Sequence, residues 1–361
     1  MDYLKEVLDS KRIKLLISGG ISLIVGLILM FIGIKVTNNL TDQQFAKRWC
    51  DDNTYAQVSA FLSEMSGFKD TTAQEVTFKI KKQLTDDSLS AENDDARILV
   101  YAYSANGKVT IKSSNGELSV EAIGVGGDYF LFHPLELVSG SYFDEDDLMK
   151  DRVVIDTETA WNLFGSNDVA GQVIEIGGIS HVICGVVKKD DSKLSVLAGN
   201  DKSTIYLSYE SLSKNGSASY INTYEALMPN PLTNYARSVL EKNISVDDSR
   251  VEVIENSGRF NWVKLLKNLK NFGTRGMNPK GVIYPYWENM ARGMEDYLAP
   301  VNLLAVVLFL YPCGLVLYIL RRMWITRRIH FADIKDFCER KAEEYRERKR
   351  KIKKGEIYDE V

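Results

Sequence analysis

Residues that could do chemistry are few and scattered in this chain of 361 residues. The three histidines, His133, His181 and His330, are isolated from one another; His133 precedes Pro134 in a turn and His181 starts a strand, so each is predicted to be structural. The acidic run at 144–147 suggests a cation site or a solvated turn, and we favour the turn because the spacing of a calcium loop is missing. We therefore predict no catalytic residue, no metal ligand and no cofactor.

Known nucleotide-binding and hydrolytic motifs are also absent from the sequence. There is no G-x-x-x-x-G-K-[ST] loop, so the chain is not expected to bind or hydrolyse ATP itself, and neither G-x-S-x-G nor H-E-x-x-H occurs. The cysteines, Cys50, Cys184, Cys313 and Cys338, form no C-x-x-C pair. For Cys50 and Cys184 a disulfide and two buried free thiols both remain open, and we favour free thiols.

Charge is segregated along the chain although the net charge is only −4, a value that argues against generic nucleic-acid binding. Residues 35–298 carry 27 basic and 37 acidic side chains, whereas residues 321–361 carry 14 basic and nine acidic ones. An acidic middle followed by a basic end is more typical of a membrane protein than of a soluble enzyme.

Two charge-free stretches, 15–34 and 299–320, are long enough to cross a hydrocarbon core of about 30 Å. We interpret 15–34 as a retained anchor and not as a signal peptide, because no small-x-small cleavage site follows it. Basic residues flank the stretches at 11–14 and 321–328, so both termini are expected in the cytoplasm. The expected location is the cell (plasma) membrane, with 35–298 outside the cytoplasm.

A face of small residues marks the first of these stretches. Glycines recur every seven residues, and Ser18, Ser22 and Gly26 every four. Small side chains let a second membrane helix approach closely, although Gly and Ser are also simply common in such helices. We predict helix packing through Ser18, Gly19, Ser22, Gly26 and Gly33.

The region between the two stretches is predicted to be α+β. Its first part reads as a strand (55–63), a helix (71–84), a strand (97–105), a hairpin turn at Asn106-Gly107 into a strand (109–112), and a second turn at Asn115-Gly116 into a strand (117–125). Its last part reads as a strand (221–228), a helix (232–242) and a strand (250–255). The middle part is rich in short strands, with one helix at 157–164 that stops at Gly165, a strand at 204–209 and a polar loop at 214–219.

Four short motifs follow one another in that middle part: GSYF at 140–143, VVIDTETAWNLFG at 153–165, GQVIEI at 171–176 and VICGV at 182–186. In type, order and spacing they resemble the extracytoplasmic core of MacB-type (macrolide-exporter-like) ABC transporter permeases. Ser141 departs from this family, in which many members carry Arg. The residues that carry the resemblance are Gly140, Phe143, Ala160, Leu163, Phe164, Gly165, Gly171 and Gly185.

The resemblance implies a porter-like domain of ferredoxin-like β-α-β units with an inserted β-rich subdomain. The porter halves would be about 53–125 and 219–258, the insert about 126–218, and the membrane-proximal segment 259–298.

The resemblance also implies a non-catalytic ABC permease-like subunit that couples a partner ATPase and permease to export or envelope events. Full-length relatives have three spans after the core, an FtsX-like unit, but one span follows it here. A separate P-loop ABC ATPase and an FtsX-like permease subunit are therefore expected, in a homo- or hetero-oligomer. The alternative is a membrane-tethered sensor or scaffold ectodomain with no ATPase partner.

Three flanking segments keep more than one interpretation. Residues 1–14 are either a brief amphipathic helix, with Leu4, Val7 and Leu8 on one face, or a frayed polar tail. Residues 260–272 are either a helix packed on the sheet or a basic amphipathic helix on the outer leaflet. The tail at 321–361 is a solvated charged helix, a lipid-headgroup contact or a docking site for a cytosolic ATPase through Phe331, Ile334 and Phe337.

Overall fold

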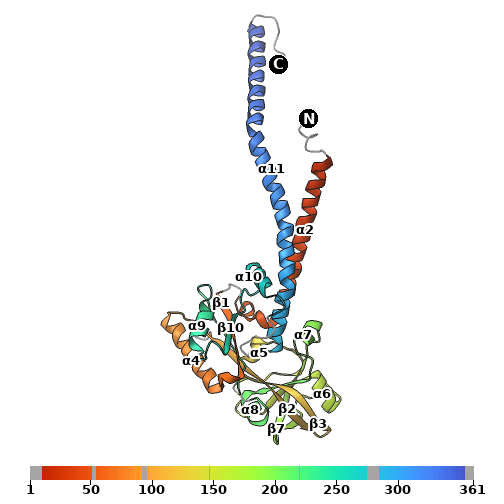
Figure 1. Ribbon diagram of the computed structural model, residues 1–361, viewed down its shortest axis with the longest axis vertical. Coiled ribbons are helices and arrows are strands. Elements are labelled where there is room, and N and C mark those ends of the chain that lie inside the picture. The colour runs from red at the N-terminus through yellow and green to blue at the C-terminus, as the bar shows by residue number, and fades with distance from the viewer. Residues whose placement is uncertain are drawn as a thin grey trace. The chain divides into compact units, whose positions relative to one another are not determined.

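The computed structural model describes residues 10–50, 54–91, 96–145, 147–218, 220–274 and 284–353, with side chains throughout except at 10–12, 326–334 and 351–353. Two compact units are present: one is Ile32–Asn302, and the other combines the two ends of the chain, up to Phe31 and from Leu303. The long helices α2 (Ser10–Asn38) and α11 (Tyr286–Lys353) take part in both units (Figure 1).

The unit of the chain ends is helical. In the described residues, two segments are long and apolar enough to cross a membrane, Ile13–Asn38 and Tyr286–Ile325. Helix α11 continues far beyond the predicted stretch 299–320, because the Arg, Lys and Glu residues that follow are themselves strong helix formers. The apolar stretch is thus the middle part of one long helix.

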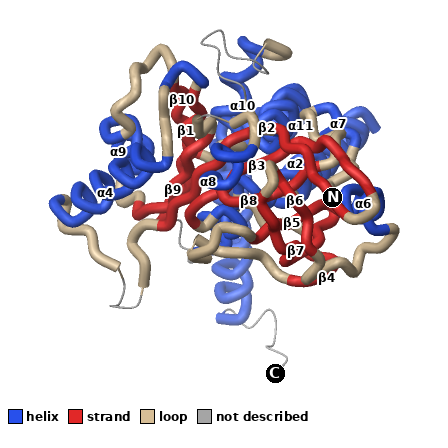
Figure 2. Tube along the Cα trace, turned by 90° about the horizontal axis from the view of Figure 1, so that it is seen from below, coloured by secondary structure: helices blue, strands red, loops and turns tan. Residues whose placement is uncertain are grey.

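The unit Ile32–Asn302 is built on one mixed sheet, which Figure 2 shows from below. The strand order is β10-β1-β9-β2-β3-β8-β5-β7-β4, and β6 pairs with β2 and β7. In the described part of the chain the strands are β1 (Tyr55–Leu62), β2 (Val100–Ser113), β3 (Gly116–Gly127), β4 (Glu136–Gly140), β5 (Arg152–Asp156), β6 (Val173–Ile176), β7 (Ile179–Lys188), β8 (Thr204–Ser208), β9 (Thr223–Pro229) and β10 (Val251–Glu255).

Short helices connect these strands and cover the sheet. They are η1 (Thr41–Gln43), α3 (Phe45–Trp49), η2 (Glu64–Ser66), α4 (Asp70–Asp86), α5 (Tyr129–Phe132), α6 (Thr157–Phe164), α7 (Lys193–Leu197), α8 (Tyr209–Asn215), α9 (Tyr235–Asn243), α10 (Trp262–Asn268) and η3 (Leu269–Asn271). Helices α4 and α9 pack on each other beside β1 and β10, whereas α6 contacts β3, β5 and β7 (Figure 1).

Strands β10, β1, β9 and β2 form an antiparallel group in which β1 runs parallel to β2 with β9 between them. Helix α4 connects β1 to β2, and α9 connects β9 to β10. Val76, Ile80 and Leu84 of α4 recur at four-residue spacing and are fully buried. They pack in the same core as alternate residues of β1, so α4 and α9 cover one face of this part of the sheet.

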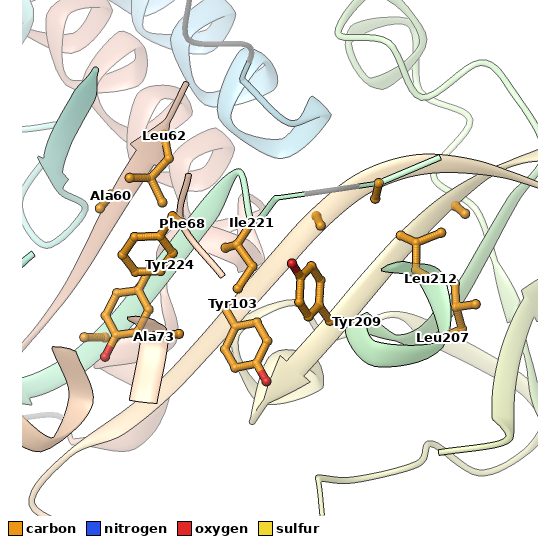
Figure 3. Close-up of a cluster of buried hydrophobic side chains, with 14 of the residues drawn as sticks. Ala60, Leu62, Phe68, Ala73, Tyr103, Leu207, Tyr209, Leu212, Ile221 and Tyr224 are labelled. Atoms are coloured by element: carbon orange, nitrogen blue, oxygen red, sulfur yellow. The ribbon is translucent and has the colours of Figure 1, made fainter. Parts of the chain in front are cut away.

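That core continues along the sheet into its second half. Figure 3 shows Phe68 and Tyr224 beside the β1 residues Ala60 and Leu62, and Tyr209, Leu207 and Leu212 further along the same cluster. The hydroxyls of Tyr224 and Thr77 lie 2.8 Å apart, which gives the buried phenol a polar partner. This largest cluster therefore extends over both halves of the sheet, and a second buried cluster, which includes Phe132, Val154 and Trp287, is separate from it.

The long hairpin β2–β3 connects the two halves. The first residues of β2 pair with β9, whereas Ile111 and Lys112 near its end pair with β6. Strand β3 pairs along its second half with β8 in parallel orientation. Backbone hydrogen bonding is therefore continuous from the β1–β9 part into the strands of the segment 126–218.

Two local predictions are wrong. Asn106-Gly107 makes no turn but lies within β2, where the Asn106 amide donates to the side-chain oxygen of Asn222 at 2.7 Å. A Cβ on Gly107 would lie 3.0 Å from the Cβ of Ala218, so this glycine permits a close approach and not a reversal. The predicted loop at 214–219 begins inside α8, which ends at Asn215. The second hairpin turn is present one residue earlier than predicted, at Ser114-Asn115, because Gly116 already pairs with Ser113. The helix that stops at Gly165, in the left-handed conformation, is confirmed.

Candidate functional site

Polar side chains gather on the face of β1 and β9 that α4 and α9 leave free. Ser59 of β1 and Glu225 of β9 are register partners, and both are buried. The Ser59 hydroxyl donates a hydrogen bond to Glu225 Oε1 at 2.6 Å, and Asn256 Nδ2 donates to Ser59 Oγ at 2.7 Å. A buried carboxylate is stable only when charged or polar partners compensate it, so this face must supply them.

His133, which follows α5, is the charged partner of Glu225. Its imidazole is fully buried, with Nε2 2.5 Å from Glu225 Oε2 and Nδ1 2.8 Å from Asp42 Oδ1. Burial alone lowers the pKa of His133, but the carboxylates of Glu225 and Asp42 outweigh it and raise the pKa to about 9. At neutral pH the ring is therefore an imidazolium that donates to both carboxylates.

Arg259 binds two carboxylates of α11 in a second part of the same face. Its two terminal nitrogens donate to the two oxygens of Glu288 at 2.6 and 2.8 Å, and Nε donates to Glu295 Oε1 at 2.5 Å. Desolvation lowers the pKa of Arg259, but Glu288 and then Glu295 raise it above the ordinary value, so the guanidinium stays charged. Arg292 donates to Glu288 at 2.6 Å and to Glu252 of β10 at 2.9 Å.

The two parts are joined into one network. Asn256 donates to Ser59 and receives a long hydrogen bond of 3.4 Å from Arg259. The network thus runs from Asp42, four residues after the end of α2, through the sheet to Glu288 at the start of α11. We name the set Asp42, Ser59, His133, Glu225, Glu252, Asn256, Arg259, Glu288, Arg292 and Glu295 the buried ionic network.

This network is suited to holding elements together and not to covalent chemistry. Its charged atoms are paired with one another, and its imidazolium is enclosed by Trp287 and Tyr129, with ring centroids 4.3 and 4.7 Å away. In the described ranges no group of three His, Cys, Asp or Glu side chains is arranged to hold a metal ion. The network therefore connects the segment that follows α2 with the first residues of α11.

The predicted small-residue face of the first stretch contacts α11 of the same chain. The hydroxyl oxygens of Ser18 and Tyr311 lie 2.8 Å apart, and the Ser22 hydroxyl donates to the Leu308 carbonyl at 2.8 Å. Further contacts involve the glycines: a Cβ on Gly19 would lie 2.7 Å from Leu315, one on Gly26 3.3 Å from the ring of Phe309, and one on Gly33 3.8 Å from Leu298.

The motif residues of the middle part pack its core. Gly140 and Gly185 are register partners of β4 and β7, and a Cβ on Gly140 would lie 2.1 Å from the Cys184 carbonyl oxygen. Gly165 and Gly171 adopt positive φ, Ala160 and Leu163 are buried, Phe164 packs on the main core, and Phe143 stacks edge-on against Phe130. These residues build the fold and make no described polar site.

The remaining predicted residues lie apart from this face. Phe337 is 56% exposed, the side chains of Phe331 and Ile334 are not described, and Leu4, Val7 and Leu8 lie outside the described residues. Cys50 and Cys184 are free thiols, and burial raises the pKa of Cys184 to about 11. His181 is held by Ser211 at 2.6 Å, and in the acidic run Glu145 accepts from the Tyr101 hydroxyl.

Sequence reasoning missed the buried ionic network, although two signals were present. Glu225 interrupts an otherwise apolar strand, TYEALM, and a lone carboxylate there requires a buried partner. Glu288, Arg292 and Glu295 follow i, i+4, i+7 spacing, which places them on one face of a helix. The shared partner of the two glutamates, Arg259, could not be found from spacing because it lies on a separate loop.

Together, these features define the class: a mixed-sheet domain joined to two apolar helices, with a paired ionic network beside the helix connections. A family model described as the MacB-like periplasmic core domain matches residues 15–241, and the chain belongs to this family. The chain is 34% identical over 83 residues to a macrolide export ATP-binding/permease protein MacB from Chromobacterium violaceum, a match that spans 22% of this chain but 13% of that protein.

Solved structures give a weaker likeness. The periplasmic region of MacB from Actinobacillus actinomycetemcomitans has a TM-score of 0.39 and 12% identity, and covers 58% of this chain and 92% of that one. The extracellular domain of a noncanonic ABC-type transporter, YknZ, from Gram-positive bacteria has a TM-score of 0.35 and 17% identity, covering 55% and 99%. The family assignment rests on the sequence match.

Proposed function

We propose that this chain is a non-catalytic, ABC permease-like subunit whose extracytoplasmic domain couples a partner ATPase and permease to export or envelope events. Membership of the MacB-like family and two apolar helices support a membrane protein with a domain outside the cytoplasm. The four-stranded group β10-β1-β9-β2, with α4 and α9, would act as a ferredoxin-like porter unit. Both termini would be cytoplasmic.

The observation that carries the proposal is the buried ionic network. It links the segment just after α2 to the first turn of α11 through charged residues of β9 and β10 and through the neutral side chains of Ser59, on β1, and Asn256. Buried paired charges resist separation, because breaking one pair leaves an uncompensated charge at a cost of about 3–5 kcal/mol. Movement of either helix end would therefore be transmitted to the sheet.

The partners in this proposal are a P-loop ABC ATPase and an FtsX-like permease subunit, because the curated relatives are ATP-binding/permease proteins. Affinity purification from the native membrane, with mild crosslinking, should retrieve both. Replacing Phe331, Ile334 and Phe337 together by Ala should release the ATPase while membrane insertion is retained, because aromatic and aliphatic anchors dominate helix interfaces. If the ATPase stays bound, the docking surface lies elsewhere.

Coupling is tested in the reconstituted complex. A cysteine at Asn215, on α8, should change its labelling rate when ATP is added, and Ser59→Ala with Asn256→Leu should abolish this change while ATP hydrolysis continues. The matched control is Ser249→Ala, in an exposed turn that the network does not reach. An ATP response that persists in the double variant would contradict coupling through the network.

The second candidate is a membrane-tethered sensor or scaffold whose ectodomain binds a ligand or envelope partner. It becomes the better account if no ATPase is retrieved from the native membrane even after crosslinking.

A further inference from the structure

An apolar patch stays exposed on the segment that leads from the sheet toward α11. Trp262, the first residue of α10, is 58% exposed, and Phe272, which caps η3, is 56% exposed. Between them Leu265 is buried, so α10 packs on the domain through Leu265 and leaves the two aromatic rings uncovered in the described structure. Single exposed apolar side chains are common, so these two aromatic rings become informative only together with the contacts and charges of their segment.

Polar contacts hold this segment along the part of α11 that precedes the apolar stretch. Asn302 Nδ2 donates to the Trp262 carbonyl at 3.0 Å, and the Gly273 amide donates to Asp296 Oδ2 at 3.2 Å. Asn302 is the fourth residue of the charge-free stretch 299–320. At 1.5 Å per residue, the Trp262 carbonyl therefore lies about 5 Å past the start of that stretch.

This depth is the boundary between hydrocarbon and headgroups if 299–320 spans the membrane. Tryptophan is enriched at that boundary because its ring is apolar and its N–H is polar. Asp296 lies six residues before Asn302, which is about 9 Å further from the membrane centre. Phe272 directly precedes Gly273, whose amide is bound to Asp296, so Phe272 lies in the headgroup layer, which is a few ångströms thick on each side.

The charges of the same segment suit a lipid surface. Lys264, Lys267 and Lys270 are exposed, and none of them forms an ion pair with a carboxylate in the described ranges, although the charge of Lys264 acts on Glu255 and lowers the pKa of that carboxyl against the effect of burial. A short helical segment with aromatic side chains and unpaired lysines is typical of helices that lie on anionic headgroups.

We propose that residues 262–272 form an interfacial anchor, in which Trp262 and Phe272 insert into the outer leaflet and the three lysines bind anionic lipid phosphates. The inference rests on the membrane anchoring in the proposed function. The anchor would hold α10 at the bilayer surface, directly beside Glu295, to which Asn268 donates at 3.4 Å. It would thereby join the buried ionic network to the lipid surface.

Tryptophan quenching tests the depth. The full chain is placed in nanodiscs of phosphatidylcholine with about 30% phosphatidylglycerol, brominated either near the headgroup or near the chain end. Wild type is compared with Trp262→Phe, with Trp161→Phe as a control of similar exposure on α6, and with Trp324→Phe, just past the other end of the charge-free stretch 299–320 of α11. We expect Trp262→Phe to lose about half or more of the shallow quenching and Trp161→Phe to lose none.

The outcomes separate the two proposals. If Trp324→Phe loses quenching but Trp262→Phe does not, the chain spans the membrane and the anchor is refuted, with the patch facing water or a protein. If no bromolipid quenches any tryptophan, the membrane anchoring itself fails.

Charge reversal tests the headgroup contact. Lys264, Lys267 and Lys270 are replaced together by Glu, and the control replaces the exposed Lys79, Lys81 and Lys82 of α4 by Glu. The first variant should show about a twofold drop in shallow quenching at low salt, and the second no change. Equal quenching in both variants would refute binding of anionic lipid by this segment.

Discussion

Replacing Arg259 by Met should destabilise the sheet domain strongly. The guanidinium is 5% exposed and donates three hydrogen bonds of 2.5 to 2.8 Å to Glu288 and Glu295, which are themselves 1% and 4% exposed. Methionine fills much of the volume but leaves both carboxylates without this cation. Breaking a buried ion pair by removing one partner costs about 3–5 kcal/mol, and Arg292 still supports Glu288, so a loss near the lower limit of about 3 kcal/mol is expected.

Chemical unfolding of the full chain in detergent, followed by tryptophan fluorescence, measures this loss. Trp287 is adjacent to Glu288 and is buried, so its emission reports on the region that changes. Arg237→Met is the matched control, because Arg237 pairs with Glu241 at 2.7 Å while both side chains are nearly half exposed. Such a surface pair contributes about 0–1 kcal/mol.

A second variant separates unpaired charge from lost packing. Adding Glu295→Gln to Arg259→Met removes one of the two carboxylates that lost the Arg259 cation, so part of the lost stability should return. If Arg259→Met unfolds at the same denaturant concentration as Arg237→Met, the reasoning about the buried network is refuted.

Three further predictions follow from the same structure. The stabilisation from His133 should be complete below pH 6.5, the ordinary pKa of histidine, and should be lost as pH rises toward the folded-state pKa of about 9. A pH series of unfolding curves should show this loss as a change of about 3 kcal/mol in the free energy of unfolding. The variant His133→Gln should not show the change. Gly26→Leu should weaken the contact of α2 with Phe309 of α11 by about 1–2 kcal/mol. The measurement is disulfide crosslinking between Ser18→Cys and Tyr311→Cys, which should fall in this variant and change little in the control Leu27→Ile, on the exposed side. Equal crosslinking in the two variants would contradict the contact. A cysteine at Asn215 should react with an impermeant reagent in intact cells and cysteines at Ser10 and Lys354 should not, so labelling of either end would exclude the hairpin topology.

Much of the fold could be predicted from the sequence because its signals are local. The spacing of Val76, Ile80 and Leu84 indicates the amphipathic helix α4, and Gly165 marks the end of α6 through its left-handed conformation. Asn106-Gly107 misled the prediction because the same dipeptide serves both turns and close backbone approach. Its neighbour Ala218 is distant in sequence, so the crowding that explains the glycine becomes visible only in the folded chain.

The candidate site was predicted less well, for a physical reason. Each member of the buried ionic network is ordinary by itself, and its meaning depends on a partner far away in the sequence. His133 appeared structural because it precedes Pro134, yet its environment is set by Asp42 and Glu225, each about ninety residues away. The small-residue pattern of the first stretch needs no distant partner to be recognised, because one helix carries all of it, and its role in helix packing stays a prediction.

The hairpin β2–β3 has a consequence for how the domain can move. Strand β2 is 14 residues long, which at about 3.3 Å per residue gives a rod of roughly 45 Å. One end is hydrogen-bonded to β9 and the other to β6, so the rod has no joint where the two halves of the sheet meet. A small rotation of β9 would therefore displace the turn before Gly116 by a larger distance than it displaces the end of β2 beside Glu225. The hairpin thus acts as a lever, whose short arm pairs with β9 and whose long arm ends at that turn.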